Sequence, residues 1–219
     1  MVTSTPIQEA VEQIPLPAQP TRARIMTAGV AKVLELSLLI VAGALLLFSM
    51  FQPYWNITLH APQYPKGLHV QAYVNEMTGD VFEVDGLNHY IGMMKLNDAA
   101  VLEREVSMVA IPLIALLAMV SFWLPGVWRM LARVPIIIYP LVFVADLFAW
   151  LYYAGHSLYP YAPLSSSIKP FTPRIVGVGT IGQFSTEAYF MAGFYLAVMA
   201  ALVVFGVTIA RRGKRDVAS

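Results

Sequence analysis

The sequence predicts a mainly α-helical membrane protein, a bundle of four transmembrane helices with a small extracytoplasmic β-hairpin cap. Hydrophobic residues make up 58% of the 219 positions and charged residues only 12%. Soluble domains have about 45–50% apolar residues and about 25% charged residues. Four apolar stretches are each long enough to cross about 30 Å of hydrocarbon. Between the first two, one segment alternates apolar and polar residues with the period of a half-buried strand.

The apolar stretches place the expected spans at about residues 30–51, 107–124, 135–154 and 188–210. Before them, residues 1–24 are rich in Pro, Gln and Thr and are expected to form a disordered cytoplasmic tail. The membrane domain is expected over residues 25–210, and residues 211–219 are expected to form a second cytoplasmic tail. The first stretch exceeds the apolar region of a signal peptide and lacks an Ala-x-Ala cleavage site, so we interpret it as a retained span.

The distribution of lysine and arginine predicts the orientation of these spans. Of the 14 basic residues, nine fall in the two tails, at the start of the first span and in the turn Pro125–Val134. The other five fall in the segments on the opposite side. Because cytoplasmic loops carry an excess of Lys and Arg, we expect a multi-pass membrane protein with both termini in the cytoplasm.

The first outer segment, residues 52–106, is too long for a simple connection and is expected to form the cap. Its residues 68–74 alternate apolar and polar side chains, which predicts a strand with one buried face. A Thr-Gly-Asp turn follows, after which Val81–Val84 is expected to return as the partner strand. Tyr54–His60 is a candidate third strand, and Gly86–Met94 is expected to form a short helix.

The second outer segment, residues 155–187, is rich in Pro, Ser and Gly and is expected to be a loop that lies against the cap. Within it, residues 177–182 match the spacing GxGxxG. A dinucleotide site needs this pattern between a strand and a helix of a βαβ unit, and an outer loop lacks that context, so we expect no nucleotide partner. A net charge of +1 gives no argument for a nucleic-acid partner either.

The absence of cysteine restricts any metal site to His, Met, carboxylate and backbone ligands. All four histidines fall in the expected outer segments, which disfavours a haem held between buried helices. If Gly86–Met94 is helical, His89 and Met93 lie on one face, four residues apart. An imidazole together with a thioether suits Cu(I). Met94 and His156 are candidate further ligands, provided that the two outer segments meet.

The same residues have a structural interpretation. In it, His89 forms hydrogen bonds at the membrane interface and the methionines pack against lipid. Asn88, His89 and Tyr90 then form a hydrogen-bonded cluster that holds the cap to the helices. Both interpretations stay open at the level of sequence.

Asp146 falls near the middle of the third expected span, where a charged acid costs about 2.5–3.5 kcal/mol on insertion scales. One interpretation is a proton or ion relay. The other is a hydrogen bond, to Tyr139 or to a Tyr, Ser or Thr of another helix. Transport pathways show several polar positions and broken helices, so a single acid favours the structural interpretation.

Several motifs resemble an uncharacterised family of bacterial four-transmembrane proteins. They are Tyr54-Trp55, Ala61–Leu68 (APQYPKGL), Gly86–Met93 (GLNHYIGM), Lys169–Pro173 (KPFTP) and Gly182–Phe184 (GQF). The resemblance covers most of the chain from the first span onward. It implies an association with gene neighbourhoods of copper enzymes, especially those for nitrous oxide reductase maturation, and of respiratory chains. It therefore implies a role in copper supply or in the assembly of an extracytoplasmic enzyme.

Two functions follow as hypotheses. In the first, a membrane accessory protein binds copper on its outer face through His89 and Met93 and delivers it to an outer enzyme. In the second, the chain is a non-catalytic structural or assembly subunit of a membrane complex of the respiratory or oxidase type. Ser165–Ser167 have no evident base and orienting acid nearby in sequence, so we expect no enzymatic activity. The expected partners are the lipid bilayer and a membrane or extracytoplasmic protein.

Overall fold

The structure is a computed structural model that describes residues 22–181 and 184–216. Contacts along the chain divide it into two compact units, residues 1–35 and residues 36–219. The boundary falls within helix α2 (Arg22–Ser49). Residues 22–24 of the expected N-terminal tail are therefore helical, and the rest of that tail lies outside the described residues. All contacts reported below lie within the second unit.

Three helices in the described residues are long and apolar enough to cross a membrane. They are α2, α5 (Gly126–His156) and α6 (Ala192–Asp216), and the apolar part of α6 ends at Arg211. Helix α4 (Val101–Val120) has 20 residues, which is long enough, but it differs from these three because it carries three charged residues, 103–105, near its start. The chain is therefore a mainly helical membrane protein with a small antiparallel sheet, as the apolar runs and the alternating segment predict.

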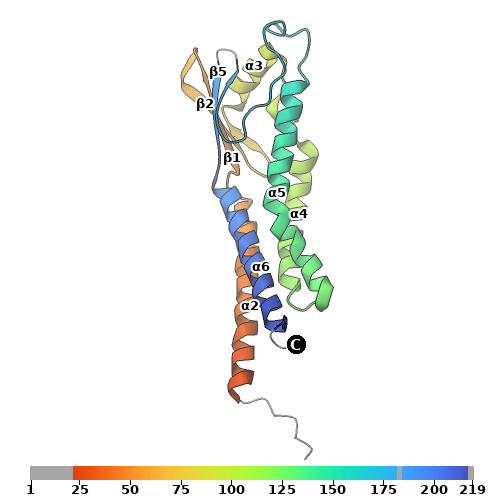
Figure 1. Ribbon diagram of the computed structural model, residues 1–219. Coiled ribbons are helices and arrows are strands. Elements are labelled where there is room, and N and C mark those ends of the chain that lie inside the picture. Colours follow the sequence, from red (N-terminus) through yellow and green to blue (C-terminus); the bar gives the residue numbers. More distant parts are fainter. Residues whose placement is uncertain (1–21, 182–183, 217–219) are drawn as a thin grey trace, which may run out of the picture. The chain divides into compact units, whose positions relative to one another are not determined.

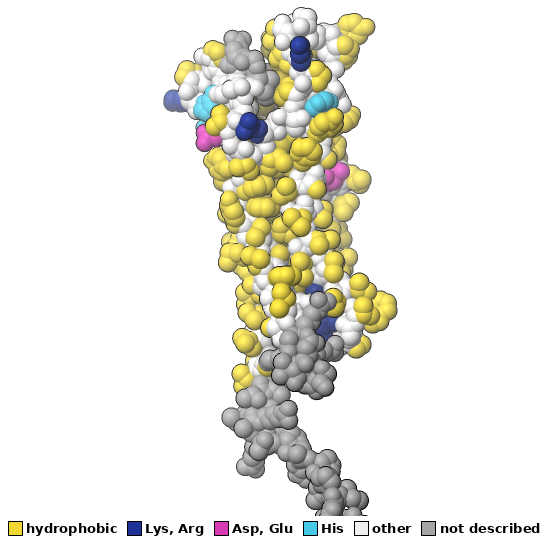
Figure 2. All heavy atoms as spheres, viewed as in Figure 1, with side chains coloured by type: hydrophobic (Ala, Val, Ile, Leu, Met, Phe, Trp, Pro, Cys, Tyr) yellow, Lys and Arg dark blue, Asp and Glu magenta, His cyan; other side chains and the backbone are white. Residues whose placement is uncertain are grey.

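Residues of α2, α4, α5 and α6 share one buried apolar cluster, which we call the helical core. Alanine is frequent in it, because small side chains let membrane helices approach closely. Large apolar side chains cover the outward faces of these helices, as Figure 2 shows for the face in view. The fully buried members of the core that lie on these helices are Leu39, Ala42, Leu46, Ile111, Ala115, Ala118, Ile136, Ala197, Ala200 and Val204.

Both outer segments contribute strands to one antiparallel sheet with the order β3-β2-β1-β5-β4 (Figure 1). The alternation predicted for residues 68–74 is confirmed, since Leu68, Val70, Ala72 and Val74 are buried. We call the sheet, helix α3 (Val81–Ile91) and residues 157–176 the cap domain. The strands are β1 (Trp55–Ala61), β2 (Tyr64–Ala72), β3 (Met77–Gly79), β4 (Gly177–Ile181) and β5 (Phe184–Phe190).

The second outer segment differs from the loop that the sequence predicts. Its last part forms β4 and β5, and β5 pairs with β1 from Trp55↔Phe190 to His60↔Ser185. Residues 188–190, expected at the start of the fourth span, therefore belong to the sheet, and α6 begins at Ala192. The expected C-terminal tail is helical as far as Asp216, beyond which it lies outside the described residues.

The predicted return strand at Val81–Val84 is wrong, because these residues begin α3, and the returning strand is the short β3. Asp80 redirects the chain between the two. Its carboxylate accepts a hydrogen bond from the backbone N–H of His69 at 2.8 Å. Its carbonyl oxygen accepts one from the N–H of Val84 at 3.1 Å. The apolar side chains of α3 recur every three to four residues, the period of a helix rather than a strand.

Tyr54 joins the cap domain to the helical core. Its side chain is fully buried, with its hydroxyl 2.6 Å from the Ser49 hydroxyl and accepting a hydrogen bond from the Tyr139 hydroxyl at 3.3 Å. Its backbone forms hydrogen bonds with the ends of the two strands that flank β1. The N–H of Tyr54 donates to the carbonyl of Ala72 at the end of β2, and its carbonyl accepts from the N–H of Met191 just after β5. Burial raises the pKa of the Tyr54 hydroxyl above its ordinary value, so this group stays neutral at the joint.

Helix α5 supports both parts of the molecule. Its 31 residues extend about 46 Å at 1.5 Å per residue, more than the hydrocarbon layer requires. Ile136 packs in the helical core, whereas Leu147 and Leu151 pack against Trp55 and Ala188 of the sheet. In Figure 1, α5 continues past the start of α4 toward the cap domain.

Candidate functional site

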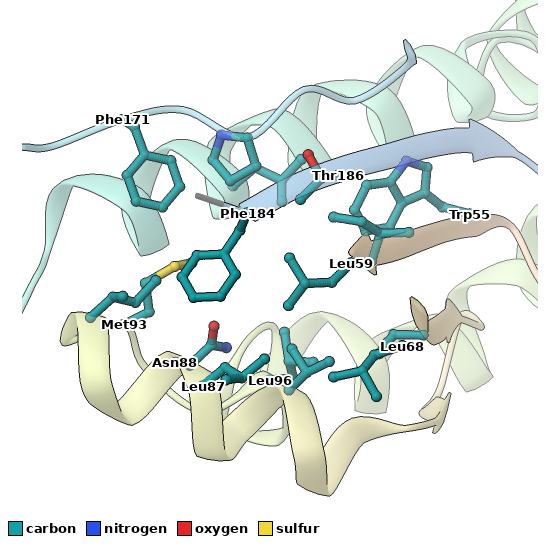
Figure 3. A pocket seen from close by; sticks show the side chains of 16 residues that line it. Trp55, Leu59, Leu68, Leu87, Asn88, Met93, Leu96, Phe171, Phe184 and Thr186 are labelled. Atoms are coloured by element: carbon teal, nitrogen blue, oxygen red, sulfur yellow. The ribbon is translucent and has the colours of Figure 1, made fainter. Parts of the chain in front are cut away.

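An apolar pocket lies inside the cap domain, between one face of the sheet and α3 (Figure 3). Its cavity volume is about 100 Å³, and about 750 Å³ of empty space lies within it when the open mouth is included. Phe171 and Pro173 of the second outer segment and Leu151 of α5 complete its walls. The sheet contributes Trp55, Leu59, Leu68 and Phe184, and α3 and the turn after it contribute Leu87, Ile91, Met93 and Leu96.

Asn88 is the most polar side chain in the pocket wall. It is only 7% exposed, and its Nδ2 donates to the carbonyl oxygen of Met94 over 3.4 Å, which is long for such a bond. Figure 3 shows its amide directed away from α3 toward Phe184 on the opposite wall. Among the described residues, that long bond is the one hydrogen bond of the Asn88 side chain, which leaves its Oδ1 available to a ligand. The other polar residue of the wall, Thr186, donates a long bond to the carbonyl of Gly179 at 3.5 Å.

The expected metal ligands His89 and Met93 do not share a helical face. Helix α3 ends at Ile91, and Gly92 takes a left-handed conformation with φ of 82°, as glycine commonly does after a helix. This turn directs the half-buried Met93 into the pocket wall. His89 stays exposed on the helix, with its ring 6.2 Å from that of Tyr90. The i, i+4 geometry behind the copper hypothesis is therefore not formed.

His156 lies at the end of α5 with interactions of its own. Its Nδ1 is 2.9 Å from the carbonyl oxygen of Tyr152, and its ring stacks on the Tyr152 ring at 4.0 Å. Met94 is half-buried after the helix end. Within the described residues, no group of three or more His, Asp or Glu side chains could hold a metal ion. The copper site stays a prediction, and it now requires ligands from both sides of a helix end.

The predicted Asn88–His89–Tyr90 cluster lies where the two outer segments meet. The backbone N–H of Leu164 donates to the carbonyl of Tyr90 at 2.9 Å, and the N–H of Tyr159 donates to the carbonyl of Gly92 at 2.8 Å. These bonds join the second outer segment to α3, rather than the cap to the helices. The expectation that this segment lies against the cap is therefore confirmed.

Helix α5 is longer than the expected span, and Asp146 lies closer to its cap-domain end than to its start. Its neighbours Phe143 and Leu147 pack against the sheet. Tyr139, its expected partner, donates its hydroxyl to Tyr54 instead. Asp146 is half-buried at the junction of the helices with the cap domain.

Three exposed tyrosines, which we call the tyrosine patch, lie at the contact between α3 and the second outer segment. Tyr90, Tyr159 and Tyr161 are 54%, 62% and 83% exposed. The rings of Tyr159 and Tyr161 are 5.6 Å apart in an edge-to-face arrangement. The backbone bonds of Tyr90 and Gly92 to the second outer segment hold the three residues in one region of the surface.

The sequence does not indicate that the pocket residues lie together, because Trp55, Phe171 and Phe184 are far apart along the chain. A partial signal exists in β5, where buried Thr186 and Ala188 alternate with exposed Glu187 and Tyr189. That pattern indicates a strand.

Comparison with family models, curated proteins and solved structures finds no match to this chain.

Proposed function

We propose that the protein is a non-catalytic accessory subunit of the membrane whose cap domain docks an extracytoplasmic partner protein. The tyrosine patch carries this proposal. Its three large side chains are each more than half exposed. Tyrosine combines a rigid apolar ring with a hydrogen-bonding hydroxyl, and it is enriched at protein interfaces and at their energetic centres.

The fixed position of the patch supports the proposal further. Both segments that carry the tyrosines are tied to each other through backbone hydrogen bonds, and α5 packs against the sheet behind them. A surface whose backbone is already ordered loses less conformational entropy on binding. The cap domain is therefore suited to a stable contact.

The proposal includes four membrane crossings, with α4 as the fourth. Strand β1 precedes α4 and β5 follows α5, yet the two strands are neighbours in one sheet. Because a sheet lies on one side of a bilayer, the chain between these strands crosses the membrane an even number of times. Helix α5 qualifies as one crossing. Helix α4 is the candidate for the other, and its charged residues lie at one end, where such side chains can reach water.

The same reasoning supports the view that both chain ends lie on the same side of the membrane. Helix α2 leads directly into β1, and β5 leads directly into α6. Both ends therefore lie across the membrane from the cap domain. The excess of Lys and Arg near those ends favours the cytoplasm for them, which makes the cap domain extracytoplasmic.

A copurification experiment tests the docking proposal. We expect that a partner crosslinked in intact cells and extracted in mild detergent is recovered with the native chain. The triple variant Tyr90→Ser, Tyr159→Ser, Tyr161→Ser should recover at least about tenfold less of the partner than the native chain, because each central interface residue contributes on the order of 1–2 kcal/mol to binding. Quantitative mass spectrometry of the recovered proteins measures the ratio.

Tyr195→Ser is the matched control, since Tyr195 is 57% exposed but lies on α6. It should recover the partner at the native level. Equal recovery with the triple variant, or a native chain that is recovered alone after crosslinking, contradicts the docking function.

A further inference from the structure

The pocket of the cap domain carries an inference that goes beyond docking and does not depend on it. We propose that this pocket binds the hydrocarbon chain of a membrane lipid, acyl or isoprenoid, and that Asn88 forms a hydrogen bond with the oxygen-bearing head of that ligand.

The walls of the pocket match a hydrocarbon chain. Aliphatic side chains from the sheet and from α3 face each other across it, and three aromatic rings, those of Trp55, Phe171 and Phe184, add to its lining (Figure 3). No Lys, Arg, Asp or Glu lines it among the described residues. Transfer of apolar ligand surface from water into such walls favours binding. The pocket therefore favours an extended apolar ligand over a charged or sugar-like one.

Asn88 supplies the second requirement, a polar contact. The Asn88 Oδ1 has no hydrogen-bond partner among the described residues, and it is not sealed from solvent, since no buried side-chain oxygen or nitrogen among them lacks a partner. This acceptor is therefore open to a ligand in the pocket. A pocket wall that served packing alone would be more stable with leucine at this position. An amide can donate to a carbonyl oxygen and accept from a hydroxyl or a protonated carboxyl. It therefore suits the head of a fatty acid as well as that of a quinone.

The position of the pocket gives it access to membrane lipids. Leu151 in its wall belongs to α5, five residues before the helix ends at His156. The same helix contains a membrane-spanning stretch. Helix α5 therefore links the pocket wall directly to a stretch that is apolar enough to lie in the bilayer.

Trp55 provides the readout, because its indole lies in the pocket wall while its Nε1 donates to the carbonyl of Ile175. In a chain with Trp123, Trp128 and Trp150 replaced by phenylalanine, Trp55 is the only tryptophan. The probes are decanoic acid and decylubiquinone, which share the decyl chain, titrated into the delipidated protein in detergent. We expect a saturable change in Trp55 emission and a rise in melting temperature, since a ligand that binds only the folded state stabilises it.

Two variants test the pocket and its polar contact. Leu87→Trp, made for the melting-temperature readout in the native background, fills the cavity and should abolish the response to both probes. Asn88→Leu should weaken probe binding at least tenfold while leaving the melting temperature without probe unchanged or higher. The matched controls are Leu141→Trp, which changes an exposed position of α5, and Asn75→Leu, which changes an exposed asparagine. Both should respond as the native chain does.

A response to decanoic acid alone identifies an acyl lipid, and a response to decylubiquinone alone identifies an isoprenoid quinone. Either response, or a response to both probes, supports the proposal. No saturable response, or one that Leu87→Trp and Leu141→Trp leave equally intact, overturns it. If Asn88→Leu lowers the melting temperature without probe and leaves probe affinity unchanged, Asn88 has only a structural role through Met94, and its part in the proposal is overturned.

Discussion

Gly155→Ala should detach the second outer segment from α5 and lower the melting temperature of the protein strongly. A Cβ atom at this position would lie 1.9 Å from the carbonyl oxygen of Phe171 and 2.9 Å from its carbonyl carbon. Both are backbone atoms, and the N–H of Phe171 also donates to the carbonyl of Gly155 at 3.1 Å. The segment has to move away, at a cost of about 3 kcal/mol, the upper part of the range for overpacked sites. Because Phe171 lines the pocket, probe binding should fall as well.

Gly206→Ala is the control for this substitution. Gly206 lies on α6, and an added Cβ meets nothing within 4 Å. The control should melt at the native temperature or slightly above it, because alanine favours a helix over glycine. Thermal unfolding in the same detergent compares the two variants. Equal melting temperatures mean that the second outer segment does not pack on Gly155.

Gly193→Ala should loosen the joint between the cap domain and the helical core. A Cβ atom here would lie 2.5 Å from Cδ2 of the Tyr54 ring and 2.7 Å from the carbonyl oxygen of Gln52. The Tyr54 ring is fully buried and hydrogen-bonded through its hydroxyl, so it has no free space to enter. The N–H of Gly193 also donates to the carbonyl of Pro53 at 2.9 Å. We expect a loss of about 2–3 kcal/mol, as for other overpacked cores.

Limited proteolysis distinguishes this loss from a general loss of folding. The cap domain of Gly193→Ala should be cleaved faster than that of the native chain, while the membrane-spanning helices stay protected by detergent. Gly206→Ala again serves as the control. A cap domain that is as resistant in Gly193→Ala as in the native chain contradicts the assignment of this contact as the joint.

The parts of the fold that follow local rules could be predicted from the sequence. The apolar runs of α2, α5 and α6 are long enough to identify spans. The alternation through Leu68, Val70 and Ala72 identifies β2, because a single buried face imposes a period of two. The pattern of Val81–Val84 misleads, because four residues are too few to separate a period of two from one of 3.6. Over the whole of α3 the helical period is clear.

The pairing of β5 with β1 and the pocket could not be predicted in this way. Both depend on contacts between segments more than 100 residues apart, such as Trp55 with Phe190. Gly177 and Gly179 also make β4 resemble a loop, although Gly179 leaves room for the side chain of Thr186 on the neighbouring strand. His89 and Met93 do not share a helical face because of one residue, Gly92, whose left-handed backbone ends the helix between them.

The central claim is that both outer segments form one domain on the outer side of a membrane that the chain crosses four times. The chain has no cysteine, so single cysteines report on this directly. Lys66→Cys and Glu187→Cys place thiols at exposed positions of β2 and β5, and Val127→Cys places one at the start of α5. A membrane-impermeant maleimide is added to intact spheroplasts, and again after the membrane is permeabilised.

We predict that Lys66→Cys and Glu187→Cys react fully in intact spheroplasts, whereas Val127→Cys reacts only after permeabilisation. If Val127→Cys reacts in intact spheroplasts together with Lys66→Cys, α4 does not cross the membrane. If the two cap-domain positions differ from each other, or both are protected until permeabilisation, the cap domain is not the extracytoplasmic docking domain proposed for it.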